Sequence, residues 1–196
     1  MNGMKDWFLL DHDITFLNHG SYGACSKTVF KEYQDWQQKL ENQPVQFMTN
    51  QVYSAMEKSR ESMSQFVGCD DEELVFFQNP TTAVTNVIYN LDLKPGHEVL
   101  MSNHEYGALV RAWKIWGEKT GVNIIQQEIS MPVTTEENFV ENFWTGVTDQ
   151  TKVIFLSHIT SSTALIFPIE KIIKLAKEQN ILTIIDGAHV PAHIPL

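Results

Sequence analysis

Residues 152–186 read KVIFLSHITSSTALIFPIEKIIKLAKEQNILTIID, and this stretch decides the fold. It opens with an apolar run, Lys152–Ser157, and closes with another, Ile181–Asp186, each as long as a buried strand. Between them, Pro168–Gln179 has apolar residues every three or four positions and lysines on the opposite side, which predicts an amphipathic helix. The order strand, helix, strand is typical of a parallel sheet with crossover helices.

The same alternation continues upstream as far as Gly68. Further strands are predicted at Glu73–Phe77, Glu98–Ser102 and Asn123–Ile129, and further helices at Thr82–Leu91, Glu105–Lys119 and Thr135–Val147. Thr134 and Glu137 have capping-box spacing ahead of one helix, and Pro168 is expected in the first turn of another. We therefore expect an α/β domain over residues 68–196, with a mostly parallel sheet wrapped by helices.

Residues 1–67 are expected to form a helical arm and loop ahead of this domain. Apolar residues recur at helical spacing in Ser26–Leu40 and again in 52–66, so each helix should turn one stripe towards a core. Gly68 stands where a glycine would end the second helix. The residues between the helices, Glu41–Asn50 with Pro44, are expected to be a linker.

Composition excludes several classes of partner. The chain of 196 residues is 43% hydrophobic and 19% charged, as expected of a folded globular protein. Its formal net charge of −10 would repel nucleic acid and anionic membranes, so we expect neither as a partner. The apolar runs are strand-sized, far short of the roughly 20 residues that cross a bilayer.

The cellular location is expected to be the cytoplasm. The N-terminal sequence MNGMKDWFLLDHD places acidic residues soon after a short apolar stretch, unlike a signal peptide. Cys25 and Cys69 show no paired-cysteine spacing, which fits free thiols in a reducing compartment and predicts no disulfide or zinc framework.

Polar side chains follow the predicted strands, at the edge where an open parallel sheet binds ligands. Thr81 and Thr82 open a helix whose N-terminus suits a phosphate, although a threonine can also cap a helix with no ligand bound. Tyr106 can stack on a planar ligand or pack in a core. The loop 157–163 is rich in hydroxyl groups, which suits either a ligand or an ordinary turn.

Asp186 is the most informative acidic residue of the chain. It ends an apolar strand, where a buried carboxylate costs desolvation energy unless a cation or a hydrogen-bond donor is present. The alternative is that Asp186 serves only as a helix N-cap after the strand. Upstream, the turn 16–23 contains Gly20 and Gly23, which let the backbone approach a ligand closely, but alone this turn indicates only a loop.

Five motifs in this order resemble the class V aminotransferase family of pyridoxal-phosphate enzymes, especially its isopenicillin N epimerase-like and cysteine desulfurase-like branches. They are LNHGSYGA at 17–24, NPTTAV at 79–84, NHEYGA at 103–108, SHITSSTALIFPI at 157–169 and IIDGAHVPAHIPL at 184–196. The resemblance implies the large domain of the aspartate aminotransferase-like fold, pyridoxal 5'-phosphate as cofactor, an amino acid as substrate, and a homodimer. The implied reaction is epimerisation, elimination, desulfuration or transamination.

The same resemblance implies a role for each matching position. Asp186 would pair with the protonated ring nitrogen and, with His189, count as catalytic. The cofactor would be held by Thr81 and Thr82 at the phosphate, by Tyr106 stacked on the ring with His104 as the second candidate, and by His189 and Ser161 near the phenolic oxygen. The amino-acid substrate would lie near Asn18, His19 and Gly20.

Two parts of the family pattern lie outside residues 1–196. Relatives bind the cofactor aldehyde as a Schiff base on a lysine that follows the Asp strand, and they carry a small C-terminal domain. We therefore expect an N-terminal part of such an enzyme, truncated before the small domain and inactive alone because its Schiff-base lysine lies beyond residue 196.

Two other hypotheses remain open. A metal-dependent hydrolase could use histidine and carboxylate ligands, although Pro191 and Pro195 argue against a regular helix over the last two histidines. Its ligands would come from His104, Glu105, Asp186, His189 and His193. A non-catalytic fragment or interaction module would instead pair with another chain through a free sheet edge and apolar surface.

Overall fold

The computed structural model describes residues 3–195. The chain divides into two compact units, and the boundary falls between Val75 and Phe76, beyond the expected boundary after residue 67. Among the helices of residues 3–195, none combines the length and the apolar character needed to cross a membrane.

The first unit is helical. Ser26 caps its first long helix by accepting a hydrogen bond from the N–H of Val29 at 3.3 Å, and Gly68 ends the second long helix in the left-handed conformation, with φ at 74°. Both helices form where they were predicted. The elements of the unit are η1 (Met4–Trp7), α1 (Lys27–Asn42), α2 (Pro44–Gln46), η2 (Phe47–Gln51), α3 (Val52–Val67) and η3 (Asp71–Glu73).

The prediction of a linker over Glu41–Asn50 is wrong. Helix α1 continues to Asn42, Gln43 leaves the helical conformation, and a new helical stretch begins at Pro44. Proline suits the first position of a helix because an N–H at that position has no acceptor within the helix, so a residue without an N–H loses no hydrogen bond. Pro44 therefore starts a helix where the sequence suggested a break.

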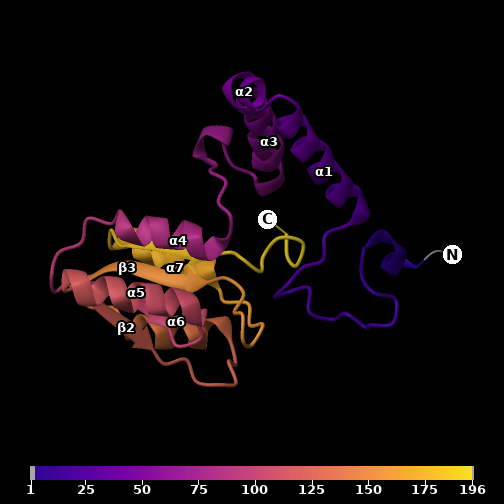
Figure 1. Cartoon of the computed structure of the whole chain (residues 1–196). Coiled ribbons are helices and arrows are strands. Elements are labelled where there is room, and N and C mark those ends of the chain that lie inside the picture. The colour runs from indigo at the N-terminus through magenta and orange to yellow at the C-terminus, as the bar shows by residue number, and fades with distance from the viewer. Residues whose placement is uncertain (1–2, 196) are drawn as a thin grey trace. The chain divides into compact units, whose positions relative to one another are not determined.

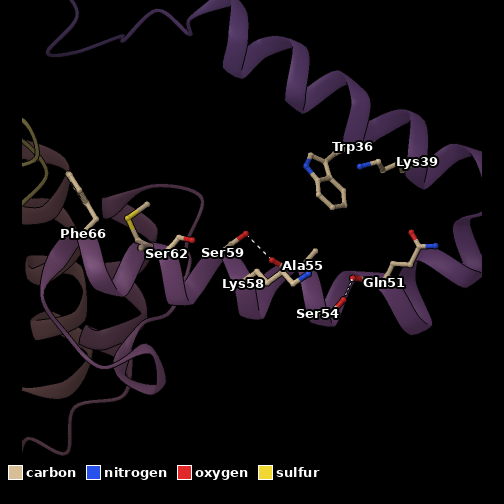
Figure 2. A pocket seen from close by; sticks show the side chains of 10 residues that line it. Trp36, Lys39, Gln51, Ser54, Ala55, Lys58, Ser59, Ser62 and Phe66 are labelled. Atoms are coloured by element: carbon tan, nitrogen blue, oxygen red, sulfur yellow. Dashed lines mark hydrogen bonds between the residues drawn. The ribbon is translucent and has the colours of Figure 1, made fainter.

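The prediction that both helices bury an apolar stripe is also wrong for the unit as described. Helix α1 has no buried residue, and the buried residue of α3 is Ser64. An open groove of about 700 Å³ lies between the two helices (Figure 2), and Trp36 and Phe66 remain partly exposed beside it. Helical periodicity thus predicted the helices correctly, but it does not identify what covers their apolar faces.

The second unit is a parallel sheet with helices on both faces (Figure 1), as predicted. Its strands lie in the order β2-β1-β3-β4, so β2 and β3, which are consecutive in the chain, lie on opposite sides of β1. Its elements are α4 (Pro80–Tyr89), β1 (Glu98–Ser102), α5 (Gly107–Thr120), β2 (Asn123–Gln127), α6 (Glu136–Trp144), β3 (Thr151–Ser157), α7 (Ile169–Glu178) and β4 (Leu182–Asp186).

The predicted strand Glu73–Phe77 does not form. Glu73 belongs to the 3-10 turn η3, and no segment of residues 3–195 pairs with the four residues that follow it. A strand needs a hydrogen-bonding neighbour as well as apolar residues. Without one, Val75 and Phe77 are 69% and 45% exposed.

Smaller corrections concern the ends of elements. Strand β2 stops at Gln127, two residues before the expected Ile129, whose N–H bonds to a side chain instead of a neighbouring strand. Helix α6 is capped by Thr135, not by a box of Thr134 and Glu137. Pro168 is the N-cap of α7 and so precedes its first turn.

Each face of the sheet has its own core. Alternation along the strands sends Val99 and Phe155 to the face covered by α4 and α5, and Leu100 and Leu156 to the face covered by α6 and α7. This alternation determines the face on which each polar residue at a strand end must lie.

Candidate functional site

Three strands of the second unit end in buried polar residues. Ser102 ends β1, Ser157 ends β3 and Asp186 ends β4. The strands are parallel, so these residues share the carboxyl edge of the sheet, and Ser157 lies directly opposite Asp186 in the β3–β4 register. A parallel sheet of this type binds ligands beyond this edge.

Asp186 lies on the face of the sheet that α4 and α5 cover. It is two residues after Ile184, which packs against the core on that face, and strand side chains alternate. Asp186 is 7% exposed, and its Oδ1 accepts a hydrogen bond from the N–H of Ala188 at 3.0 Å. No other donor within residues 3–195 bonds to this carboxylate, so its Oδ2 is left as an acceptor for a ligand.

Helix α4 places Thr81 and Thr82 towards the same edge and face. The chain leaves the end of α4 and enters β1 at its amino end, so α4 runs opposite to the strands and begins towards their carboxyl ends. Asn79 caps the helix by accepting the N–H of Thr82 at 2.8 Å, so neither threonine is the cap. Both threonines are half-buried, and within residues 3–195 neither hydroxyl has a recorded hydrogen bond.

His104 and Tyr106 both follow β1, but the protein holds only the His104 ring in place. His104 bonds through Nε2 to the carbonyl of Ile129 at 2.8 Å and packs edge-on against Phe167. Tyr106 is the N-cap residue of α5 and is 45% exposed. The histidine ring is therefore held by the protein, whereas the tyrosine ring is available to stack on a planar ligand.

His189 and Ser161 lie in the loops after β4 and β3. His189 is half-buried, three residues beyond Asp186. Ser161 is exposed in a loop that is closed by the hydroxyl groups of Thr160 and Thr163, 2.7 Å apart. The positions of both side chains at a phenolic oxygen remain a prediction.

Asn18, His19 and Gly20 belong to the first unit. The His19 ring contacts Phe16 edge-on, with ring centroids 4.7 Å apart, and its Nδ1 accepts the N–H of Ala24 at 3.4 Å. This packing orders the turn locally. The role of the three residues in substrate binding also remains a prediction.

Glu105 is the residue whose importance the sequence did not reveal. It is 8% exposed, and its Oε2 accepts the N–H and the Oγ–H of Ser157 at 2.7 and 2.6 Å, while Ser102 donates to Oε1. Burial raises the pKa of the Glu105 carboxyl above its ordinary value, these hydrogen bonds oppose that rise, and the charge of Asp186 adds to it. Sequence reasoning considered Glu105 only as a metal ligand.

The ligand set of the metal-hydrolase hypothesis does not assemble. Among residues 3–195, no group of three histidine, cysteine, aspartate or glutamate side chains is placed to hold a metal ion. Glu105 bonds to serines, and His104 bonds to a backbone carbonyl.

The groove between α1 and α3 has a different chemistry (Figure 2). Nζ of Lys39 lies 4.0 Å from the centroid of the Trp36 ring, and none of the described residues that line the groove carries a carboxylate or an imidazole. It therefore offers no acid–base pair. Its lining residues are Trp36, Lys39, Gln51, Ser54, Ala55, Lys58, Ser59, Ser62, Met63 and Phe66.

Comparisons with known proteins agree with the motifs. Isopenicillin N epimerase of Streptomyces clavuligerus is 27% identical over 98% of this chain and 50% of its own length. Hercynylcysteine sulfoxide lyase of Schizosaccharomyces pombe is 31% identical over 98% of this chain and 49% of its own length. The chain thus spans about half the length of these relatives.

Solved structures show the same fold. A C-DES mutant with glycine covalently linked to its PLP cofactor superposes with a TM-score of 0.83 at 18% identity, covering 94% of this chain and 49% of that one. Cysteine desulfurase CsdA of Escherichia coli superposes with a TM-score of 0.80 at 20% identity, covering 97% and 49%. The pattern of the family described as Aminotransferase class-V matches residues 24–196. With this match over most of its length, the chain belongs to the class-V aminotransferase family.

Proposed function

We propose that this chain is the N-terminal part of a pyridoxal-phosphate-dependent enzyme that acts on an amino acid. The observation that carries the proposal is Asp186, a buried carboxylate with a free oxygen on the face of the sheet where α4 begins. The relatives named above act as an epimerase, a lyase and a desulfurase, so the reaction of the complete protein belongs to this range.

The residues present fit the cofactor. A carboxylate with one free acceptor suits a protonated ring nitrogen, and two unbonded hydroxyls at a helix N-terminus suit a phosphate. Because Asn79 takes the N–H of Thr82, the hydroxyl groups are more important for the phosphate than the helix terminus alone. The exposed Tyr106 ring would cover one face of the pyridine ring.

Bound pyridoxal phosphate supplies an electron sink for negative charge at the substrate α-carbon. Asp186 holds a proton at the ring nitrogen and thereby keeps the ring electron-poor. His189 and Ser161 would orient the phenolic oxygen, and Asn18, His19 and Gly20 would contact the amino-acid substrate. We further propose that catalysis needs the half of the family fold that this chain does not span, and that the complete protein is a homodimer.

Binding of pyridoxal phosphate and of pyridoxal, which lacks the phosphate, tests the proposal. Equilibrium dialysis of the 196-residue chain should give a lower Kd for the phosphorylated compound. The double substitution Thr81→Val and Thr82→Val should raise that Kd about tenfold or more, because hydrogen bonds to a charged group are lost. The exposed Thr134→Val is the matched control. Equal affinity for both compounds, or no binding, would refute the proposal and favour a non-catalytic module.

A further inference from the structure

Glu105 connects two loops of the carboxyl edge that are far apart in the sequence. Strand β1 ends at Ser102, and the β1–β3 ladder ends where Met101 faces Phe155. Ser157 therefore lies beyond the last paired residue of β1, and its N–H donates to the Glu105 carboxylate at 2.7 Å instead. The side chain acts here as a strand neighbour would.

The same carboxylate is close to both predicted contacts of the cofactor ring. Tyr106 is the next residue in the chain and is the N-cap of α5. Ser157 pairs in register with Asp186, and the N–H of the following residue, His158, donates to the Asp186 carbonyl at 2.9 Å. A displacement of Glu105 would therefore move the tyrosine loop relative to the end of β4.

The Ser102 hydroxyl completes the arrangement. It donates to Glu105 and accepts the N–H of His104 at 3.2 Å, so the turn between β1 and α5 is bonded to itself as well as to β3. Three hydrogen bonds converge on one buried carboxyl group, which compensates for its loss of water.

We propose that Glu105 is a positioning residue, whose carboxyl group fixes the Tyr106 ring relative to Asp186 by tying the β1–α5 turn to the end of β3. The inference rests on the proposed function, which assigns the Tyr106 ring to one face of the cofactor ring and Asp186 to its nitrogen. Glu105 itself contacts serines, not the cofactor.

The substitution pair Glu105→Ala and Glu105→Gln tests the role. Glutamine keeps the shape, accepts the Ser157 N–H through Oε1 and donates to Ser102 through Nε2, whereas alanine removes all three hydrogen bonds. Glu118 is an exposed acid on α5, the helix that follows the turn containing Glu105, so Glu118→Ala and Glu118→Gln are matched controls.

Two measurements use the folded 196-residue chain. The first is the Kd of pyridoxal phosphate, together with the circular dichroism of its absorption band per molecule bound. The second is amide hydrogen exchange over residues 103–107 without cofactor. A residue that serves only overall stability would lower the unfolding temperature but leave the dichroism per bound molecule unchanged.

We expect Glu105→Ala to raise the Kd about tenfold or more, to reduce the dichroism and to speed exchange over residues 103–107. Glu105→Gln should stay within about threefold of the unmodified chain in Kd and keep its dichroism. The Glu118 variants should match the unmodified chain.

The inference is wrong if Glu105→Ala binds with unchanged Kd and dichroism, or if Glu105→Gln loses as much as Glu105→Ala. Should Glu105→Ala fail to fold, the glutamine variant still decides the matter, since a full loss there contradicts the positioning role and rescue supports it. If the unmodified chain binds no pyridoxal phosphate, the proposed function fails separately, and the exchange of residues 103–107 then supports or overturns the tie between the loops.

Discussion

Replacing Asp186 by asparagine separates cofactor binding from folding. Asparagine has the same shape as aspartate, and its Oδ1 can still accept the N–H of Ala188, which now lies 3.0 Å away. The recorded contact within the protein is thus preserved. What Asp186→Asn removes is the negative charge that would face a protonated ring nitrogen.

The size of the effect follows from the geometry of the carboxylate. One oxygen is used by Ala188, so a single charge-assisted hydrogen bond to the ring nitrogen is available. Such a bond contributes about 1.5–3 kcal/mol, so the Kd for pyridoxal phosphate should rise about 10- to 150-fold. The free energy of unfolding without cofactor should change by less than about 1 kcal/mol, because no recorded contact is lost.

Equilibrium dialysis and urea unfolding measure the two quantities on the same preparations. Asp149→Asn, at an exposed position before β3, is the matched control and should leave both unchanged. A cofactor analogue with carbon in place of the ring nitrogen should bind the unmodified chain and Asp186→Asn with equal affinity. If Asp186→Asn binds pyridoxal phosphate as well as the unmodified chain does, or if its effect persists with the analogue, Asp186 does not hold the ring nitrogen.

Three further predictions concern folding. Gly117→Ala should lose about 1–3 kcal/mol of unfolding free energy, because its Cβ would lie 2.7 Å from the backbone oxygen of Val122. A Cβ at Gly107 would meet open space, so Gly107→Ala should not be destabilising. Urea titration compares the two variants. Ile172→Ala, in the core between sheet and α7, should cost about 2–5 kcal/mol, and the partly exposed Ile115→Ala much less, by the same titration. The pKa of Glu105 is raised in the folded protein, so its contribution to stability is complete below the ordinary value of 4.5 and declines as pH rises through the folded pKa. The unfolding free energy of the unmodified chain should therefore fall with rising pH relative to that of Glu105→Gln. Parallel curves for the two proteins would contradict this.

The sheet was predictable because its strands carry local signals. Glu98–Ser102 was predicted at both ends, since an apolar run there is bounded by turn residues and has neighbours on both sides. Glu73–Phe77 has a similar composition but no partner in residues 3–195, and it forms no strand. Composition records the tendency of a segment to pair, while the presence of a partner depends on the rest of the fold.

The sequence predicted the edge of the sheet at which the candidate site lies, but not all of its residues. A topological rule placed the polar residues after each strand at one edge, and the alternation of β4 then puts Asp186 on the face of α4. Glu105 could not be found in this way, because its partner Ser157 lies 52 residues further along the chain. A contact of that range depends on strand order, which the sequence alone does not give.

The buried polar groups at the carboxyl edge are not equally satisfied. Ser102, Ser157 and Glu105 bond to one another, so their burial is compensated within the protein. Asp186 lies at the same edge and is also buried, but within residues 3–195 its carboxylate accepts one hydrogen bond, from the N–H of Ala188. A buried carboxylate costs desolvation energy unless hydrogen-bond donors or a cation compensate for the lost water. Because these three neighbours satisfy one another, Asp186 is the buried acid at this edge with acceptor capacity left over, and this is why the proposed function assigns it to a protonated ring nitrogen.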